Sequence, residues 1–377
     1  MSLQPTAKDQ PAIGLSGVAV KTWEENILFS VLVELTYRCN LDCSFCYNDT
    51  SLKGEPLSKE QYFAFFQDLA DLQVLNLTLS GGEPLAHPHF FELGARAREL
   101  GFVVRVKSNG HALRGELARR VKEEVDPYVI EVSLHGSTAE IHDRQTRVEG
   151  SFDRLMSNLD EIIALGLRVQ LNCTLTAWNE HQVAEMLEIS DRLQIKMLID
   201  PEVTPRDNGD KTPLEILPSR ARIAELYRLL QERAAAGAGE NISIGMEGDT
   251  GLVPVRSKKH CGAGSSTVAI DPYGDVYPCV QWRWSAGNLH RQSIREIWDD
   301  SSVLEDVRES NQEVKQLVES FGDRGKMMGF CPGAAWVNTG SPTGMYRSPM
   351  DKMGAHDGGN GDSPQEQGRS ELLPVIG

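Results

Sequence analysis

Strand patterns and helix patterns alternate along residues 31–200 of this 377-residue chain, and this alternation constrains its fold more than any other feature. Six alternations predict right-handed crossovers and a parallel sheet. The functional side chains of such a sheet lie in loops at the carboxyl ends of its strands. Leu75, Leu77 and Leu79 are expected to share one face of the second strand. Apolar or alternating segments typical of strands occupy residues 31–36, 75–80, 103–107, 129–134, 169–175 and 196–200.

The segments between these strands carry helix signals. In residues 58–72, Ser58 and Gln61 are spaced as a capping box. A second helix is expected to end at Leu100 and a third before Gly166, because glycine is favoured just after a helix. The apolar stripe of the first of these helices consists of Tyr62, Phe65, Phe66 and Leu69.

The pattern changes after the sixth strand. Residues 201–218 are rich in Pro, Asp and Gly, and one more helix follows before an Ala/Gly run, so we place a domain boundary near residue 240. The next part contains one clear short helix at 293–299, and the polar, aperiodic sequence after Gly340 predicts a mobile tail. The predicted units are an N-terminal extension (1–27), an α/β domain (28–240), a small cysteine-containing domain (241–340) and the tail (341–377).

The charge balance restricts the partners. With 38 basic and 54 acidic residues the net charge is −16, so the average surface repels phosphate backbones and anionic lipids. We therefore expect no nucleic-acid partner and no membrane partner. No apolar run approaches the roughly 20 residues that cross a bilayer, and the opening residues do not resemble a signal peptide, which predicts a cytoplasmic protein.

The cysteines indicate metal chemistry. Seven cysteines, an odd number, do not suit a secreted disulfide framework, whereas clustered thiols indicate metal binding or catalysis. Cys39, Cys43 and Cys46 directly follow the first predicted strand. Three thiolates can hold an iron–sulfur cluster and leave one iron open to an external chelate. The alternatives are a partial zinc site, which needs a fourth ligand, and three separate buried thiols.

The CxxxCxxC spacing, with Phe45 before its last cysteine, resembles the signature of the radical S-adenosylmethionine (SAM) superfamily. The resemblance implies a partial (β/α)6 TIM-like barrel and a [4Fe-4S] cluster whose open iron binds SAM. Cleavage of SAM by an electron from a reductant such as flavodoxin or ferredoxin would give a 5′-deoxyadenosyl radical. Phe45 and the backbone of Tyr47 would contact the adenine.

The loops after the next strands also resemble SAM-binding motifs of this family. In SGGEP, glycines permit close backbone approach, and the glutamate would hold the SAM ammonium group. Residues after the third and fourth strands resemble the family residues that contact the ribose and the carboxylate of SAM. The residues implied in these roles are Gly81, Gly82, Glu83, Ser108, Asn109 and Ser133.

The arginine that pairs with the SAM carboxylate is not at its usual place. Thr146 stands where the family pattern expects it. Arg144 or Arg147 would substitute, and the sequence leaves the choice open; the alternative is that either is a solvated surface charge.

A second set of cysteines, Cys261, Cys279 and Cys331, lies in the C-terminal part. Their context, including AIDPYGDVYPC and GNLHRQSIREIWDD, resembles the auxiliary-cluster extensions called SPASM and twitch domains. The resemblance implies one auxiliary [4Fe-4S] cluster with an unidentified fourth ligand. His260 is adjacent but is expected to be a surface histidine, and a zinc site or separate thiols are the alternatives. Trp282, Trp284 and Trp336 are expected to pack around this site, and Cys173 in the core.

The resemblance implies a radical SAM oxidoreductase, a maturase that oxidises or cross-links a side chain of a ribosomally synthesised peptide. The first alternative is a dehydrogenase of a small alcohol or cofactor precursor. The second is a non-catalytic cluster-binding partner protein. The first 30 residues are expected to be too few for a peptide-recognition domain, so leader binding would require a separate protein or the barrel itself. The sequence identifies no catalytic base.

Overall fold

All six predicted strands form one parallel sheet in chain order. The computed structural model describes residues 15–235, 242–244 and 257–356. Each predicted strand begins and ends within two residues of its expected bounds. The strands are β1 (Ser30–Glu34), β2 (Asn76–Ser80), β3 (Val103–Ser108), β4 (Val129–Ser133), β5 (Val169–Thr174) and β6 (Lys196–Asp200). The prediction of an α/β fold with six parallel strands is confirmed.

Further strands widen this sheet at both edges. The order is β10-β9-β8-β1-β2-β3-β4-β5-β6-β7. At one edge, β7 (Ile242–Ile244) pairs in parallel with β6. On the other side, β8 (Thr267–Ile270) pairs in parallel with β1, with Ser30 opposite Thr267. β9 (Asp275–Tyr277) and β10 (Gly287–Asn288) continue the sheet in antiparallel pairs.

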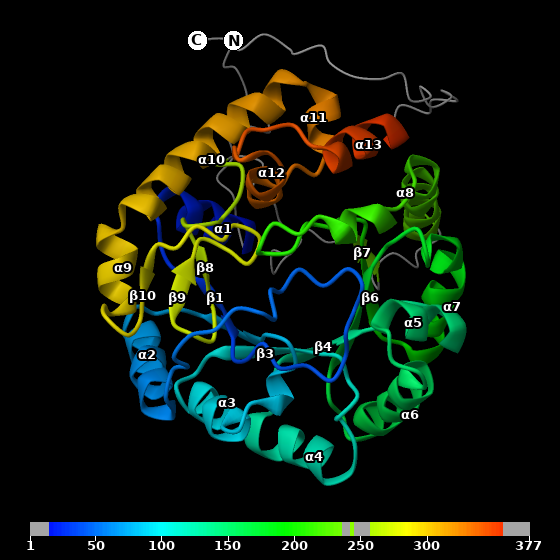
Figure 1. Cartoon of the computed structure of the whole chain (residues 1–377), viewed down its shortest axis with the longest axis horizontal. Helices are drawn as coiled ribbons and strands as arrows, with labels where there is room; N and C mark the ends of the chain where they lie inside the picture. The colour runs from blue at the N-terminus through cyan, green and yellow to red at the C-terminus, as the bar shows by residue number, and fades with distance from the viewer. Residues whose placement is uncertain (1–14, 236–241, 245–256, 357–377) are drawn as a thin grey trace, which may run out of the picture.

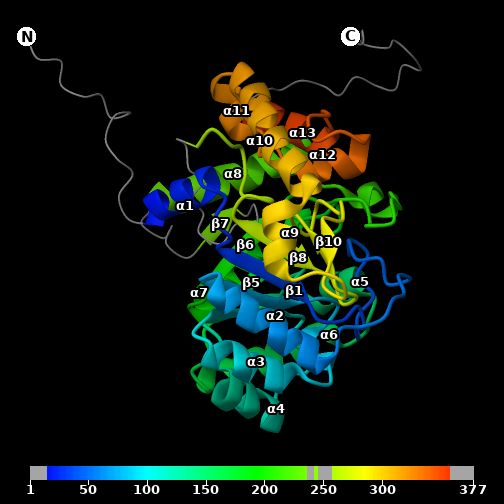
Figure 2. The same cartoon turned by 90° about the vertical axis from the view of Figure 1, so that its left-hand side faces the viewer.

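Helices surround the outer side of the barrel strands, and α2, α3, α4, α6 and α7 form an arc there in Figure 1. Figure 2 shows α10 to α13 gathered at the end of the molecule opposite α3 and α4. The barrel helices are α2 (Lys59–Asp71), α3 (Phe90–Glu99), α4 (Gly115–Arg120), α5 (Ala139–Thr146), α6 (Ser151–Ala164), α7 (Val183–Leu193) and α8 (Arg220–Ala235). The others are α1 (Leu15–Glu24), α9 (Ile294–Asp300), α10 (Ser302–Ser320), α11 (Asp323–Met327), α12 (Pro332–Thr339) and α13 (Arg347–His356).

The expected helix signals operate as predicted in α2. The Ser58 hydroxyl accepts a hydrogen bond from the Gln61 N–H, and the Gln61 side chain accepts one from the Ser58 N–H. This box satisfies donors that a helix start otherwise leaves unpaired. Its predicted apolar stripe is buried against the sheet, and α3 and α6 end at their expected places.

The C-terminal part shares the main core with the barrel. Val268, Ile270 and Val276 from β8 and β9 belong to the same buried apolar cluster as the barrel strands. Ile297 and Trp298 of α9 join this cluster as well. A separate core would leave β1 with an unpaired edge, whereas the shared sheet buries it on both sides. The boundary expected near residue 240 lies outside the described residues.

The prediction of a mobile tail from residue 341 is wrong for part of that segment. Residues 347–356 form α13, and Lys352 on this helix is buried and pairs with Glu202 at 2.5 Å. Tyr346 and Met353 belong to a second apolar cluster with α10 and α12. Met353 is the one described α13 residue in this cluster, so the segment shows no apolar stripe, and tertiary contact alone reveals the helix. Residues 357–377 lie outside the described part of the chain.

Within the described residues, no helix combines the length and apolar character required to cross a bilayer.

The expectation that Leu75 shares the buried face of Leu77 and Leu79 is wrong. Leu75 precedes β2 and is 42% exposed, whereas Leu77 and Leu79 are fully buried. We therefore expect Leu77→Ala to lower the free energy of unfolding by about 2–5 kcal/mol, through lost burial and a cavity. The matched variant Leu75→Ala should change it by about 0.5 kcal/mol or less. Anaerobic urea unfolding measures both, and equal losses would contradict the assigned register.

Candidate functional site

The first set of thiols lies on the segment that follows β1, at the carboxyl end of the sheet. Cys39, Cys43 and Cys46 are free, and burial raises the pKa of each thiol. Cys43 also has its pKa raised by the charges of the other two, so the three lie near one another. The backbone N–H groups of residues 42 and 44 donate to carbonyls of residues 146 and 145 at 3.1 and 3.0 Å. These bonds hold the segment against the end of α5.

The glycines after β2 allow two backbones to touch. Gly81 has φ +131°, and a Cβ atom there would lie 2.3 Å from the Thr36 carbonyl oxygen. A Cβ on Gly82 would lie 2.7 Å from the Arg38 carbonyl oxygen. The Gly82 N–H donates to the Thr36 carbonyl at 2.6 Å. Any side chain would push the SGGEP loop away from the cysteine segment, so glycine is required at both positions.

Glu83 is buried among residues from β3. Its carboxylate accepts hydrogen bonds from the Ser108 hydroxyl at 3.0 Å and the Asn109 N–H at 2.8 Å. The Leu85 N–H donates to it as well, at 3.2 Å. Burial raises the pKa of Glu83 to about 7 despite these bonds, which favour the ionised form. A cation placed beside it would favour ionisation, so the residue suits an ammonium ligand.

Asparagine side chains join these loops to the thiols. The Asn109 amide donates to Asn40 Oδ1 at 2.7 Å and lies 3.7 Å from the Cys39 sulfur. Asn48 donates to the Gly81 carbonyl at 3.2 Å, while its own Oδ1 is buried without a partner. Glu83, Ser108, Asn109 and the cysteine segment are therefore brought together, as the sequence predicted.

The two aromatic residues of the cysteine motif make different contacts. The Phe45 ring packs on His135, with ring centroids 4.5 Å apart. The Tyr47 hydroxyl donates to Glu34 at 3.1 Å. Ser133 ends β4 and is half-buried opposite Asn172 of β5. Ser133 therefore lies on the expected strand end, one strand away from Ser108.

The two candidate arginines differ in their surroundings. Arg147 pairs with Asp42 on the cysteine segment, at 3.2 Å. Arg144 instead lies over the Trp178 ring, 4.2 Å from its centroid. Arg147 is thus the arginine that already contacts the segment of the thiols.

The second set of thiols lies between β8, β9 and α12. Burial raises the pKa of Cys261, Cys279 and Cys331 to about 12, and each thiol has its pKa raised further by another member of the set. The Cys261 thiol donates to Asn311 of α10 at 3.2 Å. His260 is half-buried rather than on the surface, and its Nε2 lies 2.8 Å from the Phe330 carbonyl oxygen. This contact occupies Nε2 at the residue directly before Cys331.

Tryptophans pack around this second set as expected. The rings of Trp284 and Trp336 stack with centroids 5.1 Å apart and an interplanar angle of 6°. Both pack with Cys261 and Cys279 against the buried Trp282. Cys173, by contrast, is buried in the barrel core beside Met186.

Both sets of residues fit iron–sulfur clusters better than single metal ions. Among the residues that the structure describes, no three Cys, His, Asp or Glu side chains are grouped closely enough for one ion. A zinc ion needs all of its ligands within about 2.0–2.3 Å. A four-iron cluster binds each thiolate at a different iron, so its ligands stand further apart. Beside the first set, Asn48 Oδ1 and His111 Nε2 are buried without partners, as a polar ligand would require.

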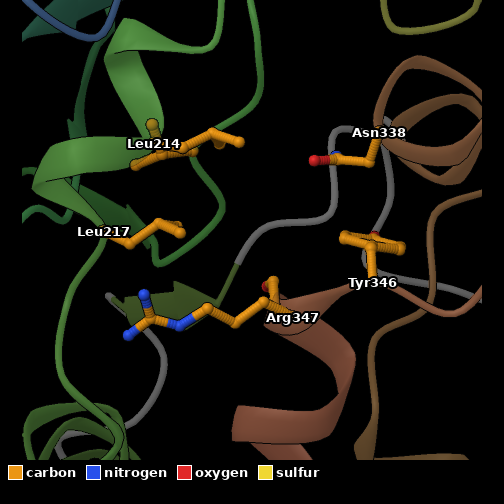
Figure 3. A pocket seen from close by; sticks show the side chains of 7 residues that line it. Leu214, Leu217, Asn338, Tyr346 and Arg347 are labelled. Carbon is orange, nitrogen blue, oxygen red and sulfur yellow. The ribbon is translucent and has the colours of Figure 1, made fainter. Parts of the chain in front are cut away.

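A pocket of about 180 Å³ opens between the barrel and the C-terminal helices. Figure 3 shows Leu214 and Leu217 facing Asn338 and Tyr346, with Arg347 extending beside them. The Tyr346 hydroxyl accepts a hydrogen bond from the Cys331 N–H at 3.2 Å. One wall of this pocket therefore touches the second set of thiols.

Sequence reasoning missed a group of charged residues between the two sets. Arg283 donates to Glu34 at 2.9 Å and lies 3.2 Å from Asp207. A glutamate inside the apolar run VLVELT is unusual for a buried strand, and this signal could have identified Glu34. No sequence pattern indicates that Asp207 and Arg283 meet it.

Comparison with known protein families gives the class of the chain. The model of the radical SAM superfamily matches residues 33–189. The model of SPASM, an iron–sulfur cluster-binding domain, matches residues 261–320. The chain belongs to the radical SAM superfamily and carries a SPASM domain. The two families imply SAM and iron–sulfur clusters as its cofactors.

Individual relatives place it near peptide maturases. The mycofactocin maturase MftC of Mycobacterium tuberculosis is 29% identical over 318 residues, which cover 81% of this chain and 76% of MftC. The AdoMet-dependent heme synthase of Methanosarcina barkeri is 25% identical over 301 residues, covering 74% and 84%. The structure of Streptococcus suis SuiB bound to S-adenosylmethionine matches with a TM-score of 0.67 at 16% identity, covering 86% of this chain and 77% of SuiB. SuiB therefore shares the fold.

Glu83→Gln should remove a pH-dependent loss of stability. The pKa of Glu83 is raised from 4.5 to about 7 in the folded chain, so the folded state binds a proton at this residue more tightly than the unfolded state does. This proton contributes fully to the free energy of unfolding below about pH 4.5, and the contribution is lost as the pH rises through 7. This loss amounts to about 3 kcal/mol, at about 1.4 kcal/mol per pKa unit. In urea unfolding of the SAM-free chain, wild type should lose stability relative to the variant between about pH 5 and pH 8. A difference that does not change with pH would contradict this.

Arg147→Met should weaken SAM binding to the anaerobically reconstituted chain by about tenfold or more, since a hydrogen bond to a charged group contributes about 1.5–3 kcal/mol. Arg144→Met is the matched control and should bind SAM as wild type does. Isothermal titration measures both affinities. Weaker binding by the Arg144 variant alone would reverse the assignment.

Proposed function

We propose that the chain is a peptide maturase that oxidises or cross-links a side chain of a ribosomally synthesised peptide. The observation that carries this proposal is the presence of two separate sets of three thiols, joined through the charged group of Glu34, Asp207 and Arg283. One set suits radical formation, and the other suits removal of the second electron of an oxidation. The relationship to the PqqA peptide cyclase of Ruegeria pomeroyi, which is 29% identical over 291 residues, supports a peptide substrate.

In this proposal, the chain's own residues bind and orient SAM. Cys39, Cys43 and Cys46 hold the first cluster, and the backbone of Gly81 and Gly82 lines the SAM site. When bound, cluster and SAM supply a radical that removes a hydrogen atom from an unactivated carbon. Glu83 holds the SAM ammonium group, and its buried carboxylate favours a cation over water at that place.

The remaining SAM contacts come from neighbouring strand ends. Ser108 and Asn109 position Glu83 through their hydrogen bonds. Phe45 and the Tyr47 backbone would contact the adenine, and Ser133 the ribose or carboxylate. Arg147 would pair with the SAM carboxylate because it already reaches the cysteine segment.

We further propose one auxiliary [4Fe-4S] cluster on Cys261, Cys279 and Cys331. His260 remains a candidate for its fourth ligand through Nδ1, because a metal-bound histidine usually donates its other ring N–H to a carbonyl, as Nε2 can to Phe330. Without such a ligand, the fourth iron would be open to substrate. The adjoining pocket has room for about one side chain of a peptide beside Cys331.

A second candidate function is oxidation of a small cofactor precursor. The relationship to the AdoMet-dependent heme synthase favours it. This function would need no leader-recognition protein, whereas a peptide maturase would use either a separate one or its own barrel. SuiB, which shares the fold, has been solved with its precursor peptide SuiA. Both candidates need an external reductant, such as flavodoxin or ferredoxin.

The test uses the anaerobically reconstituted chain, SAM, dithionite and each short peptide encoded beside its gene. We expect one peptide to lose about two daltons, one hydrogen pair, for every 5′-deoxyadenosine formed, as a two-electron oxidation demands. Mass spectrometry of peptide and nucleoside gives both amounts. Cys43→Ala is the control and should form neither product.

Two outcomes would contradict the proposal. Oxidation of a small alcohol or porphyrin precursor, with every peptide unchanged, would favour the second candidate. Failure to form any 5′-deoxyadenosine under strong reduction would favour a non-catalytic, cluster-binding role.

A further inference from the structure

A buried group of three charged side chains lies between the two sets of thiols. Glu34 comes from the end of β1, Asp207 from the segment after β6, and Arg283 from the segment after β9. One nitrogen of Arg283, Nη2, lies 2.9 Å from Glu34 Oε1 and 3.2 Å from Asp207 Oδ2. Two carboxylates therefore share a single cation in a place with little water.

The two carboxylates differ in how fully they are bound. Glu34 has no exposed surface, and both of its oxygens accept hydrogen bonds, Oε2 from Tyr37 and Oε1 from Tyr47 and Arg283. Asp207 is 15% exposed, and Arg283 is the one side chain among the described residues that contacts its carboxylate. Glu34 is therefore the fixed counter-ion of Arg283, while Asp207 is open to an incoming group.

The backbone of Asp207 joins it to the segment of the first set of thiols. Its N–H donates to the Tyr47 carbonyl at 2.8 Å, and Tyr47 directly follows Cys46. Arg283 lies on the same segment as Cys279, between Trp282 and Trp284, which pack around the second set of thiols. Asp207 thus contacts residues that adjoin both sets.

Burial, rather than the neighbouring charges, favours a bound proton on Asp207. Arg283, Glu34 and Asp49 face it from three other segments, and on its own segment Arg206 pairs with Asp210. Burial, the largest effect, raises the pKa of Asp207 to about 7, although Arg283 opposes the shift. A carboxylate with such a pKa takes up and releases protons readily at neutral pH.

Every two-electron oxidation started by hydrogen-atom removal must also release a proton. The substrate C–H bond and one further O–H, N–H, S–H or C–H bond break, and one new bond forms. Bound SAM would supply the adenosyl radical that takes the hydrogen atom, and an auxiliary cluster held by Cys261, Cys279 and Cys331 would supply an acceptor for the electron. The proton needs an acceptor near the substrate, and Glu34 cannot serve because its oxygens are already occupied.

We propose that Asp207 is the catalytic proton acceptor for substrate oxidation, with Arg283 and Glu34 as its positioning residues. This assignment rests on the proposed function of the chain as a radical SAM oxidase. Protonation of Asp207 leaves Arg283 paired with Glu34, so the group changes from a net charge of −1 to a neutral ion pair. Because Asp207 lies between the two sets of thiols, the hydrogen atom, the proton and the electron of one substrate would each be taken up by a different group.

The first experiment needs no substrate. Infrared difference spectra of the reconstituted wild type and of Asp207→Asn should show one carboxylic acid signal that is absent from the variant. In wild type this signal should disappear with a midpoint near pH 7. A midpoint below about pH 5, in the ordinary range of aspartate, would overturn the proposal.

The second experiment uses the adjacent-gene peptide that loses mass with the wild-type chain. Asp207→Asn should give about 10²-fold less oxidised peptide for each 5′-deoxyadenosine formed, the effect of losing a general base. Asp207→Glu should recover part of this yield because it restores a carboxylate. Asp210→Asn, on the same segment but exposed, is the matched control and should keep the wild-type ratio.

Several outcomes would overturn the assignment. An unchanged ratio of peptide to nucleoside in Asp207→Asn would show that the proton goes elsewhere. Loss of nucleoside formation together with product would place Asp207 in SAM binding instead. If wild type modifies no peptide at all, the proposed function fails, and the infrared titration still decides whether Asp207 exchanges a proton at neutral pH.

Discussion

The parallel pairing of β1 with both β2 and β8 is the contact on which the rest of the structure depends. Parallel strands in one sheet end at the same edge, so whatever follows them is brought together. β1 leads into the first three thiols, and β2 leads into the glycine loop that touches them. β8 attaches the C-terminal part directly to this central strand. The second set of thiols is therefore held at a defined place relative to the first.

The site contains buried carboxylates, and the stability of the hydrophobic core must offset the free-energy cost of burying them. Glu83 and Asp207 both have a raised pKa because burial disfavours their ionised forms. Buried ion pairs and carboxylates seldom add stability, since loss of water costs more than pairing returns. The large shared core of barrel and C-terminal strands supplies the stability that allows such groups to stay inside. A role in the reaction at the strand ends explains best why these carboxylates are buried.

The SPASM domain is joined to the barrel by more than a linker. Arg283 reaches from it into the charged group at the end of β1, and α13 returns to the barrel through Lys352 and Glu202. These contacts are ionic and largely buried, so removal of either partner would leave an unpaired charge. Such contacts favour one fixed arrangement of the two sets of thiols.

Local patterns in the sequence were enough to predict much of this protein. Alternating apolar residues identified the six strands, the capping box identified α2, and short cysteine spacing identified the class of chemistry. Glu83, Ser108 and Asn109 were each predicted from the end of a strand, and the structure brings them together. The strand and helix predictions succeed because each depends on residues close in the chain, and the common edge of a parallel sheet brings the residues at the strand ends together.

Tertiary structure alone decided the rest. The sequence of α13 shows no apolar stripe, and this helix packs on α8 and α11 and, through Met353, on the apolar cluster of α10 and α12. The meeting of Glu34, Asp207 and Arg283 joins three distant segments, and no local pattern records it. The contact of Arg147 with the cysteine segment also joins residues that are distant in the chain. The sequence determined the strands, the two sets of thiols and the class of chemistry, because these follow from short-range periodicity and spacing. Only the tertiary structure decided which charged groups share a buried space, because that depends on long-range packing.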